Sequence, residues 1–399
     1  MTELTTETRN ATLADLAELL QQQQTRKVDM VVPATKMRAV NGEIVVKGAD
    51  PLLTETGVDV VDGTYRTTDV FEEGLSGKLN IPREYLRRMR LTRTDLWDAN
   101  VNGWLHGRRP LIRNSTDGSG FETVRPGVDP DPRAFLLRTF RGEDGTGIAR
   151  ALLSDQYGFV DHLDALTAAL DGVKEAGVEV NIESCDLSDR RMYVRVVAEQ
   201  VNALAPTLLR HYRSPFNHNS GTDNPVVFAG FVISNSETGN GAWSITPRLV
   251  VMVCRNGMTI NADAIRGVHL GQRLDEGIIR WSEDTKRKQL ELMKAKTADV
   301  VRTALDVDYL QAKIEEIENK ADHKLTSHAD EAVKTVTNRL KFPEHVRDAV
   351  LQHFIEAGDT TAGGVMQAVT SAAQVVESPD MSSEMEGKAL EALTLASYL

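Results

Sequence analysis

The chain has 399 residues, a net charge of −12 and 41% hydrophobic residues, which is an ordinary composition for a globular protein with two or three domains. The apolar runs are far shorter than the ~20 residues needed to cross a bilayer, and the first thirty residues lack the pattern of a secretory signal. Two cysteines are too few for a disulfide framework, so we expect a cytoplasmic protein. Because the apolar runs are short, we also expect no membrane partner.

The first 125 residues predict an N-terminal helix followed by an α+β region. In residues 1–30, leucines at helical spacing follow Thr12, which suits a helix cap, and four glutamines then indicate a helix end or linker. Residues 31–125 begin with β-branched runs separated by Asn-Gly and Asp-Gly turns, which favours strands. Further along, Pro82 suits the first turn of a helix, and residues 91–104 favour a second helix or a broken one.

Residues 126–265 predict a β-rich core. The segment PGVDPDP, at 126–132, is typical of a linker. Three hairpins are expected beyond it, with turns in GEDGTG, in DLSDR and in SETGNGA, and residues 161–177 predict an amphipathic helix between the first two. We expect one α+β domain with a mainly antiparallel sheet.

Strand signals end near Val268, and residues 266–399 predict a helical C-terminal region. Residues 271–306 contain no proline and have apolar residues every three or four positions, which favours one long helix. This last third is also the most acidic part of the chain, with 17 basic and 24 acidic side chains in residues 261–399. The fold class expected for the whole chain is α+β: a central antiparallel sheet of hairpins packed with helices, followed by helices alone.

Catalytic and metal-binding motifs are not apparent. The chain has no P-loop, no dinucleotide fingerprint and no nucleophile elbow, and its histidines do not follow zinc-ligand spacing. We therefore expect no catalytic residues, no metal and no cofactor, and a protein that is not an enzyme. One alternative stays open, which is an unfamiliar active site built from Asn217, His218, Asp223, Arg255 and Asn256.

A basic segment lies within this acidic chain. Residues 77–113 contain nine basic and three acidic side chains, and Arg83, Arg87 and Arg90 fall on one helical face. Arginines interleaved with aromatic residues are typical of surfaces that follow a phosphate backbone and stack bases. The alternative is a solvated helix face that pairs with acidic helices. The candidate nucleic-acid-binding residues are Arg83, Arg87, Arg88, Arg90, Arg93, Arg108, Arg109, Arg113, Arg138, Arg255 and Asn256.

The third hairpin ends in Cys254, which follows the apolar run VVMV. A neighbouring arginine could lower its pKa, but a cysteine at such a position is more often a small buried hydrophobic residue, and we expect core packing. The loop at residues 234–241 combines glycines with small polar side chains. This composition would allow the backbone to approach DNA or a neighbouring subunit closely.

Several segments together resemble a family of phage and plasmid proteins that share an uncharacterised conserved domain. The resemblance rests on YRTTDVFEEGLSGKLNIPREYLRRM, FLLRTFRGEDGTGIARALLSDQYGFVDHLDAL, the third hairpin, AIRGVHLGQRLDEG and GDTTAGGVMQAVTSAA, which together cover about residues 60–375. It departs from the family pattern where a common tryptophan is replaced by Gly363 or Gly364. The resemblance implies a bacteriophage, plasmid or prophage context, and hence the cytoplasm of a bacterial host.

The predicted fold is similar in outline to ring-forming single-strand annealing proteins, an analogy at the level of the fold. Annealing proteins need a positive groove and subunit contacts but no catalytic residues. We therefore expect a phage or prophage protein that binds single-stranded DNA, assembles as a homo-oligomer and anneals strands in recombination. The alternative is a non-catalytic assembly or host-interaction protein, either forming a cage or sequestering a host factor.

Overall fold

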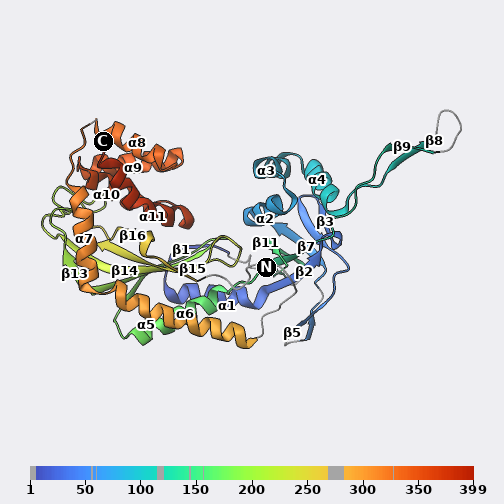
Figure 1. Cartoon of the computed structure of the whole chain (residues 1–399), viewed down its shortest axis with the longest axis horizontal. Helices are drawn as coiled ribbons and strands as arrows, with labels where there is room; N and C mark the ends of the chain where they lie inside the picture. Colours follow the sequence, from blue (N-terminus) through green and yellow to red (C-terminus); the bar gives the residue numbers. More distant parts are fainter. Residues whose placement is uncertain are drawn as a thin grey trace. The chain divides into compact units, whose positions relative to one another are not determined.

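Two β-sheets, each with its own helices, organise the chain (Figure 1). The computed structural model describes residues 6–54, 57–59, 61–114, 121–142, 145–155, 157–267, 283–326 and 328–399. Its fold class is the α+β class with a helical C-terminal region that the sequence predicts.

The chain divides into two compact units, which we call the larger and the smaller unit. The larger unit comprises residues 1–19, 160–269 and 279–399, and the smaller unit comprises residues 20–159 and 270–278. The first boundary falls inside helix α1 (Leu13–Arg26), which includes the four glutamines. Among the described residues, no helix combines the length and apolar character needed to span a membrane.

The smaller unit is built on a six-stranded mixed sheet with the order β2-β10-β11-β7-β4-β3. Strands β11 and β7 are parallel and the other pairs are antiparallel. The strands are β2 (Lys27–Pro33), β3 (Met37–Val40), β4 (Glu43–Val46), β7 (Gly63–Thr67), β10 (Ala134–Arg141) and β11 (Thr146–Ser154), with the short 3-10 helix η1 (Ala34–Lys36) after β2. Two separate ribbons pair β5 (Leu52–Thr54) with β6 (Gly57–Asp59) and β8 (Leu111–Asn114) with β9 (Phe121–Arg125).

The first predicted hairpin is confirmed as β10–β11, but it does not join the other two hairpins. Its partners are β2 and β7 of the smaller unit, so the boundary between units lies after Phe159 and not at residue 126. The sequence prediction differs because strand partners are chosen by matching apolar faces over long sequence separations, which a local pattern does not encode.

Three helices cover one face of this sheet: α2 (Asp69–Leu79), α3 (Arg83–Thr92) and α4 (Thr94–His106) (Figure 1). The Thr68 hydroxyl caps α2 by accepting from the Phe71 N–H at 3.1 Å. Asn80 ends α2 in the left-handed conformation, and Pro82 precedes α3. The buried side chains of these helices, including Phe71, Leu86 and Trp97, pack in one core with the sheet.

The larger unit is built on an antiparallel sheet with the order β1-β12-β13-β14-β15-β16, and β17 pairs with β15. The strands are β1 (Thr8–Ala11), β12 (Asn181–Leu187), β13 (Met192–Leu204), β14 (Val226–Asn235), β15 (Trp243–Val251), β16 (Gly257–Thr259) and β17 (Ile265–Gly267), with the 3-10 helix η2 (Asn261–Asp263) before β17. The second and third predicted hairpins are thereby confirmed as β12–β13 and β14–β15.

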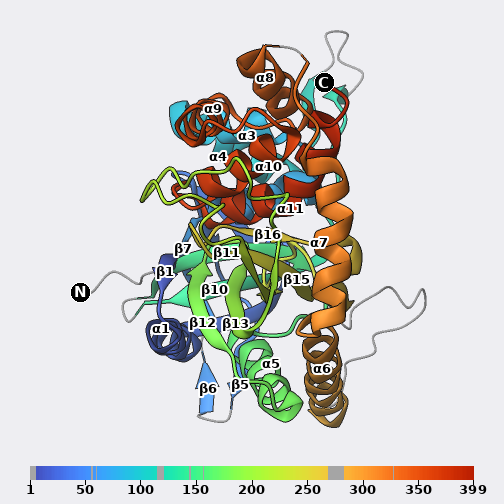
Figure 2. The same cartoon turned by 90° about the vertical axis from the view of Figure 1, so that its left-hand side faces the viewer.

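Helices lie on both faces of this sheet (Figure 2). Helices α5 (His162–Ala176) and α6 (Glu283–Ala304) cover one face, and α10 (Ala362–Ala373) and α11 (Pro379–Ala396) cover the other. The remaining helices are α7 (Val307–Ala321), α8 (Ala329–Arg339) and α9 (Glu344–Ala357). The described part of the long helix predicted for residues 271–306 begins at Glu283, and residues 268–282 lie outside the described residues.

Candidate functional site

Helix α3 presents a basic face because its apolar residues point into the core of the smaller unit. Leu86 and Met89 are buried, whereas Arg87 and Arg88 are exposed. Tyr85 lies three residues before Arg88, so both side chains occupy the same face of the helix. The tyrosine ring is 52% exposed, which leaves an aromatic face and a guanidinium side by side at the surface.

Acidic neighbours neutralise some of the predicted arginines. Arg83 forms an ion pair with Glu73, Arg90 forms ion pairs with Glu72 and Asp69, and Arg93 pairs with Asp95 at 2.7 Å. Burial raises the pKa of Glu72, and its contact with Arg90 partly opposes that rise. These three arginines therefore have less positive charge to offer a ligand than the sequence alone suggests.

Two exposed arginines of α3, Arg87 and Arg88, have no such ion-pair partner among the described residues, although the charge of Arg87 helps to lower the pKa of Glu72. Within the described part of the chain, the side chains of Arg87 and Arg88 form neither a hydrogen bond nor an ion pair. Arg109, which follows α4, is exposed and likewise unpaired among the described residues. A guanidinium that is not already engaged can bind a phosphate without first breaking an internal contact.

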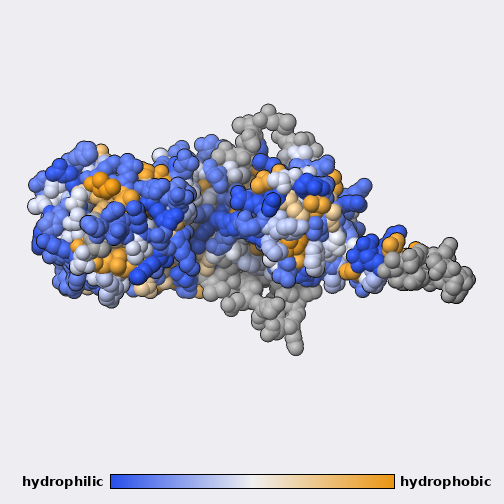
Figure 3. Space-filling view, turned by 90° about the horizontal axis from the view of Figure 1, so that it is seen from above, coloured by the Kyte–Doolittle hydropathy of each residue, from blue (hydrophilic) through white to orange (hydrophobic). Residues whose placement is uncertain are grey.

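Helix α4 adds a second exposed aromatic ring. Trp104 is 55% exposed, whereas Trp97 of the same helix belongs to the core. We define the α3–α4 surface by Tyr85, Arg87, Arg88, Trp104 and Arg109. Figure 3 shows hydrophobic patches among hydrophilic ones over the part of the smaller unit that α3 and α4 form.

The remaining basic residues predicted in this region are Arg108 and Arg113. Arg108 is exposed, and its Nη2 donates to the Pro126 carbonyl at 3.3 Å. Arg113 belongs to β8, and its side chain lies outside the described residues.

Arg138 is an internal residue and does not face solvent. Its side chain is 0% exposed, its Nη2 pairs with Asp29 at 2.8 Å, and its guanidinium lies 3.5 Å from the centre of the Phe159 ring. The prediction that Arg138 contacts nucleic acid is therefore not supported. Its position on β10 directs it to the buried second face of the sheet, which could not be known without the register.

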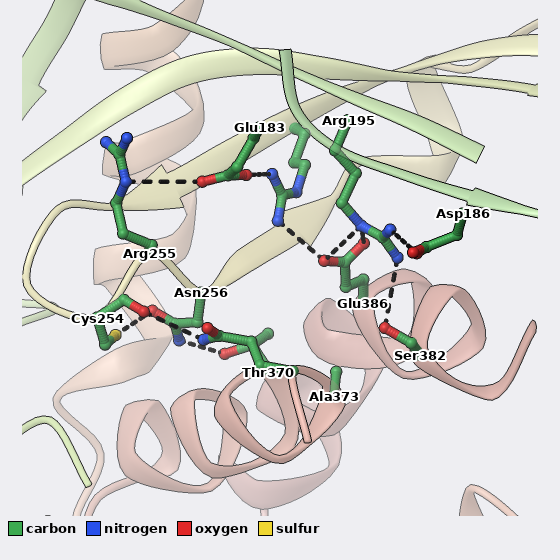
Figure 4. Close-up of polar contacts among 12 residues, drawn as sticks. Glu183, Asp186, Arg195, Cys254, Arg255, Asn256, Thr370, Ala373, Ser382 and Glu386 are labelled. Atoms are coloured by element: carbon green, nitrogen blue, oxygen red, sulfur yellow. Dashed lines mark hydrogen bonds and ion pairs between the residues drawn. The ribbon is translucent and has the colours of Figure 1, made fainter. Parts of the chain in front are cut away.

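Asn256 is also internal. Its amide is 0% exposed and donates to Gln367 Oε1 at 2.6 Å and to Thr370 Oγ1 at 2.5 Å, which joins the turn between β15 and β16 to helix α10 (Figure 4). It accepts from the Cys254 thiol. The predicted ligand role of Asn256 is not supported, because a ligand would have to displace these buried hydrogen bonds.

Cys254 and Arg255, which precede Asn256, differ in their exposure to solvent. Cys254 is buried, as predicted, and burial raises the pKa of its thiol to about 11. Arg255 adopts a positive φ of 58° and is partly exposed, but it pairs with Glu199 at 2.8 Å and with Glu183 at 3.7 Å. Both contacts oppose an approach of Arg255 to an anionic ligand.

The loop at residues 234–241 is mostly enclosed. Residues 234–238 are buried, and Arg191 holds the loop by donating to Ser234 Oγ and to the Ala242 carbonyl, each at 3.0 Å. Glu237 accepts from the His162 N–H at 2.5 Å and so caps helix α5. The loop therefore organises the larger unit, and only its last residues, 239–241, reach solvent.

A buried arginine network lies between the larger unit's sheet and α11 (Figure 4). Glu386 accepts from Arg195 Nε at 3.1 Å and from Arg248 Nη2 at 2.9 Å. Arg195 also pairs with Asp186, and Arg248 with Glu183. Burial alone would raise the pKa of Glu386, but the two guanidinium groups outweigh burial and hold that pKa below its usual 4.5.

The sequence does not predict this network. The only signal in the sequence is that Arg195 and Arg248 are charged residues within apolar strands. Glu386 resembles the many solvated acids of the C-terminal helices, so nothing local marks it as their partner. Gly257 makes room for the network, since a Cβ at this position would overlap with the Arg248 guanidinium.

The residues of the alternative active site do not form one polar cluster. Asn217 donates to the Val253 carbonyl at 3.1 Å, and His218 and Asp223 are exposed, while Asn256 is engaged in the interior. Among the described residues, no group of three or more histidine, cysteine or acidic side chains is arranged to hold a metal ion.

Comparisons with known proteins leave the chain without an assigned relative. No family model, no curated protein and no solved structure matches it. The resemblance to phage and plasmid proteins therefore stays a prediction.

Proposed function

We propose that the chain binds single-stranded nucleic acid through the α3–α4 surface, as an oligomeric annealing protein of a phage or prophage. The observation that carries the proposal is the pair Arg87 and Arg88, exposed and without ion-pair partners among the described residues, beside the exposed ring of Tyr85. The phage context and the annealing role rest on the family resemblance and the fold analogy alone.

Charge and stacking act together in this proposal. Binding of a polyanion responds to the local field within a Debye length of ~8–10 Å, so the net charge of −12 does not oppose it. The rings of Tyr85 and Trp104 offer faces on which unpaired bases can stack, a contact worth about 1–3 kcal/mol per base. Bases in a duplex are already stacked, which is why the proposal specifies single strands.

The first experiment removes two charges from α3. The R87A/R88A variant should bind a fluorescent single-stranded oligonucleotide more weakly, and the slope of log K against log salt should fall by about 1.4, since each phosphate contact to a single strand contributes about 0.7. Fluorescence anisotropy over a salt series measures both quantities. The matched control is R287A/K288A, which removes two exposed charges from α6 and should leave the slope unchanged.

The second experiment follows Trp104. Binding should quench its fluorescence, and W104L should weaken binding by about 1–3 kcal/mol with little change in the salt slope, because stacking involves no counterion release. Failure of the wild-type protein to bind oligonucleotides at low salt would contradict the proposal. Equal affinity for single strands and duplexes would contradict the stacking role.

A further inference from the structure

Helix α2 lies against helix α3 and presents carboxylates to its arginines. Three arginines share one face of α3 because they follow one another at helical spacing, and three acidic residues lie within the first two turns of α2. The arginines are Arg83, Arg87 and Arg90, and the acidic residues are Asp69, Glu72 and Glu73. A row of positive charges is thus met by a cluster of negative charges from the same unit.

The ion pairs between the two helices differ in how firmly they are held. Arg90 contacts Glu72, whose side chain is 2% exposed, and it also pairs with Asp69 at 3.4 Å. Arg83 pairs with Glu73, and these side chains are 42% and 22% exposed. Because exposed ion pairs are weak and breaking a buried one is costly, the pair of Arg83 and Glu73 is the one that a ligand can reach and separate.

A phosphate group at this position would compete with Glu73 for Arg83. A guanidinium binds carboxylate and phosphate through the same N–H groups, so it cannot serve both fully at once. Arg83 lies one turn before Arg87, about 6 Å along the axis of α3 and on the same face. A nucleic-acid strand bound at Arg87 would therefore pass close to Arg83, whose guanidinium already pairs with Glu73.

We propose that Glu73 is an internal competitor for phosphate, which holds Arg83 away from nucleic acid and thereby lowers the affinity of the α3–α4 surface. This inference concerns the regulation of that surface, so it rests on the proposed function. An exposed ion pair changes an equilibrium by only about 1.5-fold to fivefold, so Glu73 weakens binding without preventing it. The competition would therefore set how readily a bound strand leaves the surface.

A double-mutant cycle on the pair tests the competition. E73Q keeps the shape of the side chain and removes its charge, which makes Arg83 available to phosphate. E73Q should bind the fluorescent single-stranded oligonucleotide about 1.5-fold to fivefold more tightly than the wild-type chain. The slope of log K against log salt should grow in magnitude by about 0.7, the contribution of one phosphate contact to a single strand. R83A should remove this extra slope from E73Q but leave the slope of the wild-type chain unchanged.

The matched control is E84Q. Glu84 adjoins Arg83 on α3, is exposed and forms no ion pair within the described part of the chain. E84Q therefore removes one negative charge beside Arg83 without releasing a guanidinium, so it reports the general change in the local field alone. Its slope should equal that of the wild-type chain. E73A, which also removes the carboxylate, should behave as E73Q does and covers a failure of E73Q to fold, which circular dichroism detects.

The results distinguish a failure of this inference from a failure of the proposed function. If the wild-type chain binds and R87A/R88A weakens binding, but E73Q has the affinity and slope of E84Q, the competition is overturned and the proposed function stands. An effect of R83A that is equally large in the wild-type chain and in E73Q would also overturn the competition. If the wild-type chain, E73Q and E73A all fail to bind the oligonucleotide at low salt, both proposals are wrong.

Discussion

Glu386 shows how one residue can hold two layers of the larger unit together. It lies on α11 and joins arginines from β13 and β15, with each partner nearly inaccessible to solvent. Removing one member of a buried ion pair costs about 3–5 kcal/mol, because the remaining charges lose their partner while staying out of water.

We therefore expect E386Q to lower the free energy of unfolding by about 3–5 kcal/mol in urea titrations. The matched control is E384Q, two residues earlier on α11, where the carboxylate is exposed and pairs with Lys388. Exposed pairs within a helix contribute about 0.3–0.5 kcal/mol, so E384Q should change stability only slightly. Equal effects of the two substitutions would contradict the role assigned to the network.

The same residue gives a pH dependence with a defined sign. The pKa of Glu386 in the folded state is held below its usual 4.5 by Arg195 and Arg248, against the effect of burial. Its contribution to stability is therefore complete above pH 4.5 and is lost as the pH falls through the lower folded value. Urea midpoints measured down to about pH 3 should fall more steeply for the wild-type chain than for E386Q.

At the scale of secondary structure, the sequence predicted most hairpins and helices well, but it did not predict which of their residues are buried by distant segments. The hairpins β10–β11, β12–β13 and β14–β15 and the helix α5 were all predicted from apolar periodicity and turn residues. Helix α2, which contains two glycines and a Phe-Glu-Glu step, was not predicted. The 234–241 loop was predicted to approach DNA or a neighbouring subunit, whereas residues 234–238 are buried by contacts with Arg191 and α5. Neither of these adjoins the loop in the sequence, so the sequence pattern does not predict the burial.

The contact between the 234–241 loop and the start of helix α5 gives a testable prediction. Asp161 precedes the helix but makes no side-chain cap, and Glu237 accepts from the His162 N–H instead. We expect E237A to lower the free energy of unfolding by about 1–3 kcal/mol, because a buried N–H would lose its acceptor. Urea titrations followed by circular dichroism measure this effect. E179A, at an exposed position, should be neutral, and a neutral E237A would show that the cap is dispensable.

At the scale of the whole molecule, the units do not follow the order of segments along the chain. The core of the smaller unit includes residues from Met30 to Leu152, so it crosses the predicted linker at residues 126–132. We expect a fragment of residues 20–159 to unfold cooperatively in urea, because it contains this core. A fragment of residues 126–265 should not, because its first hairpin would lack the partners β2 and β7. The reverse outcome would contradict the assignment of units.

The sequence by itself determined the α+β class, the hairpins, the helical C-terminal region and the basic face of α3, because these depend on local periodicity and turn chemistry. Only the tertiary structure decided which arginines reach solvent. Arg87 and Arg88 remain exposed, whereas Arg138, Arg195 and Arg248 are internal. The reason is physical: the environment of a charged side chain depends on which distant carboxylates and strands surround it, and that depends on pairing over long sequence separations.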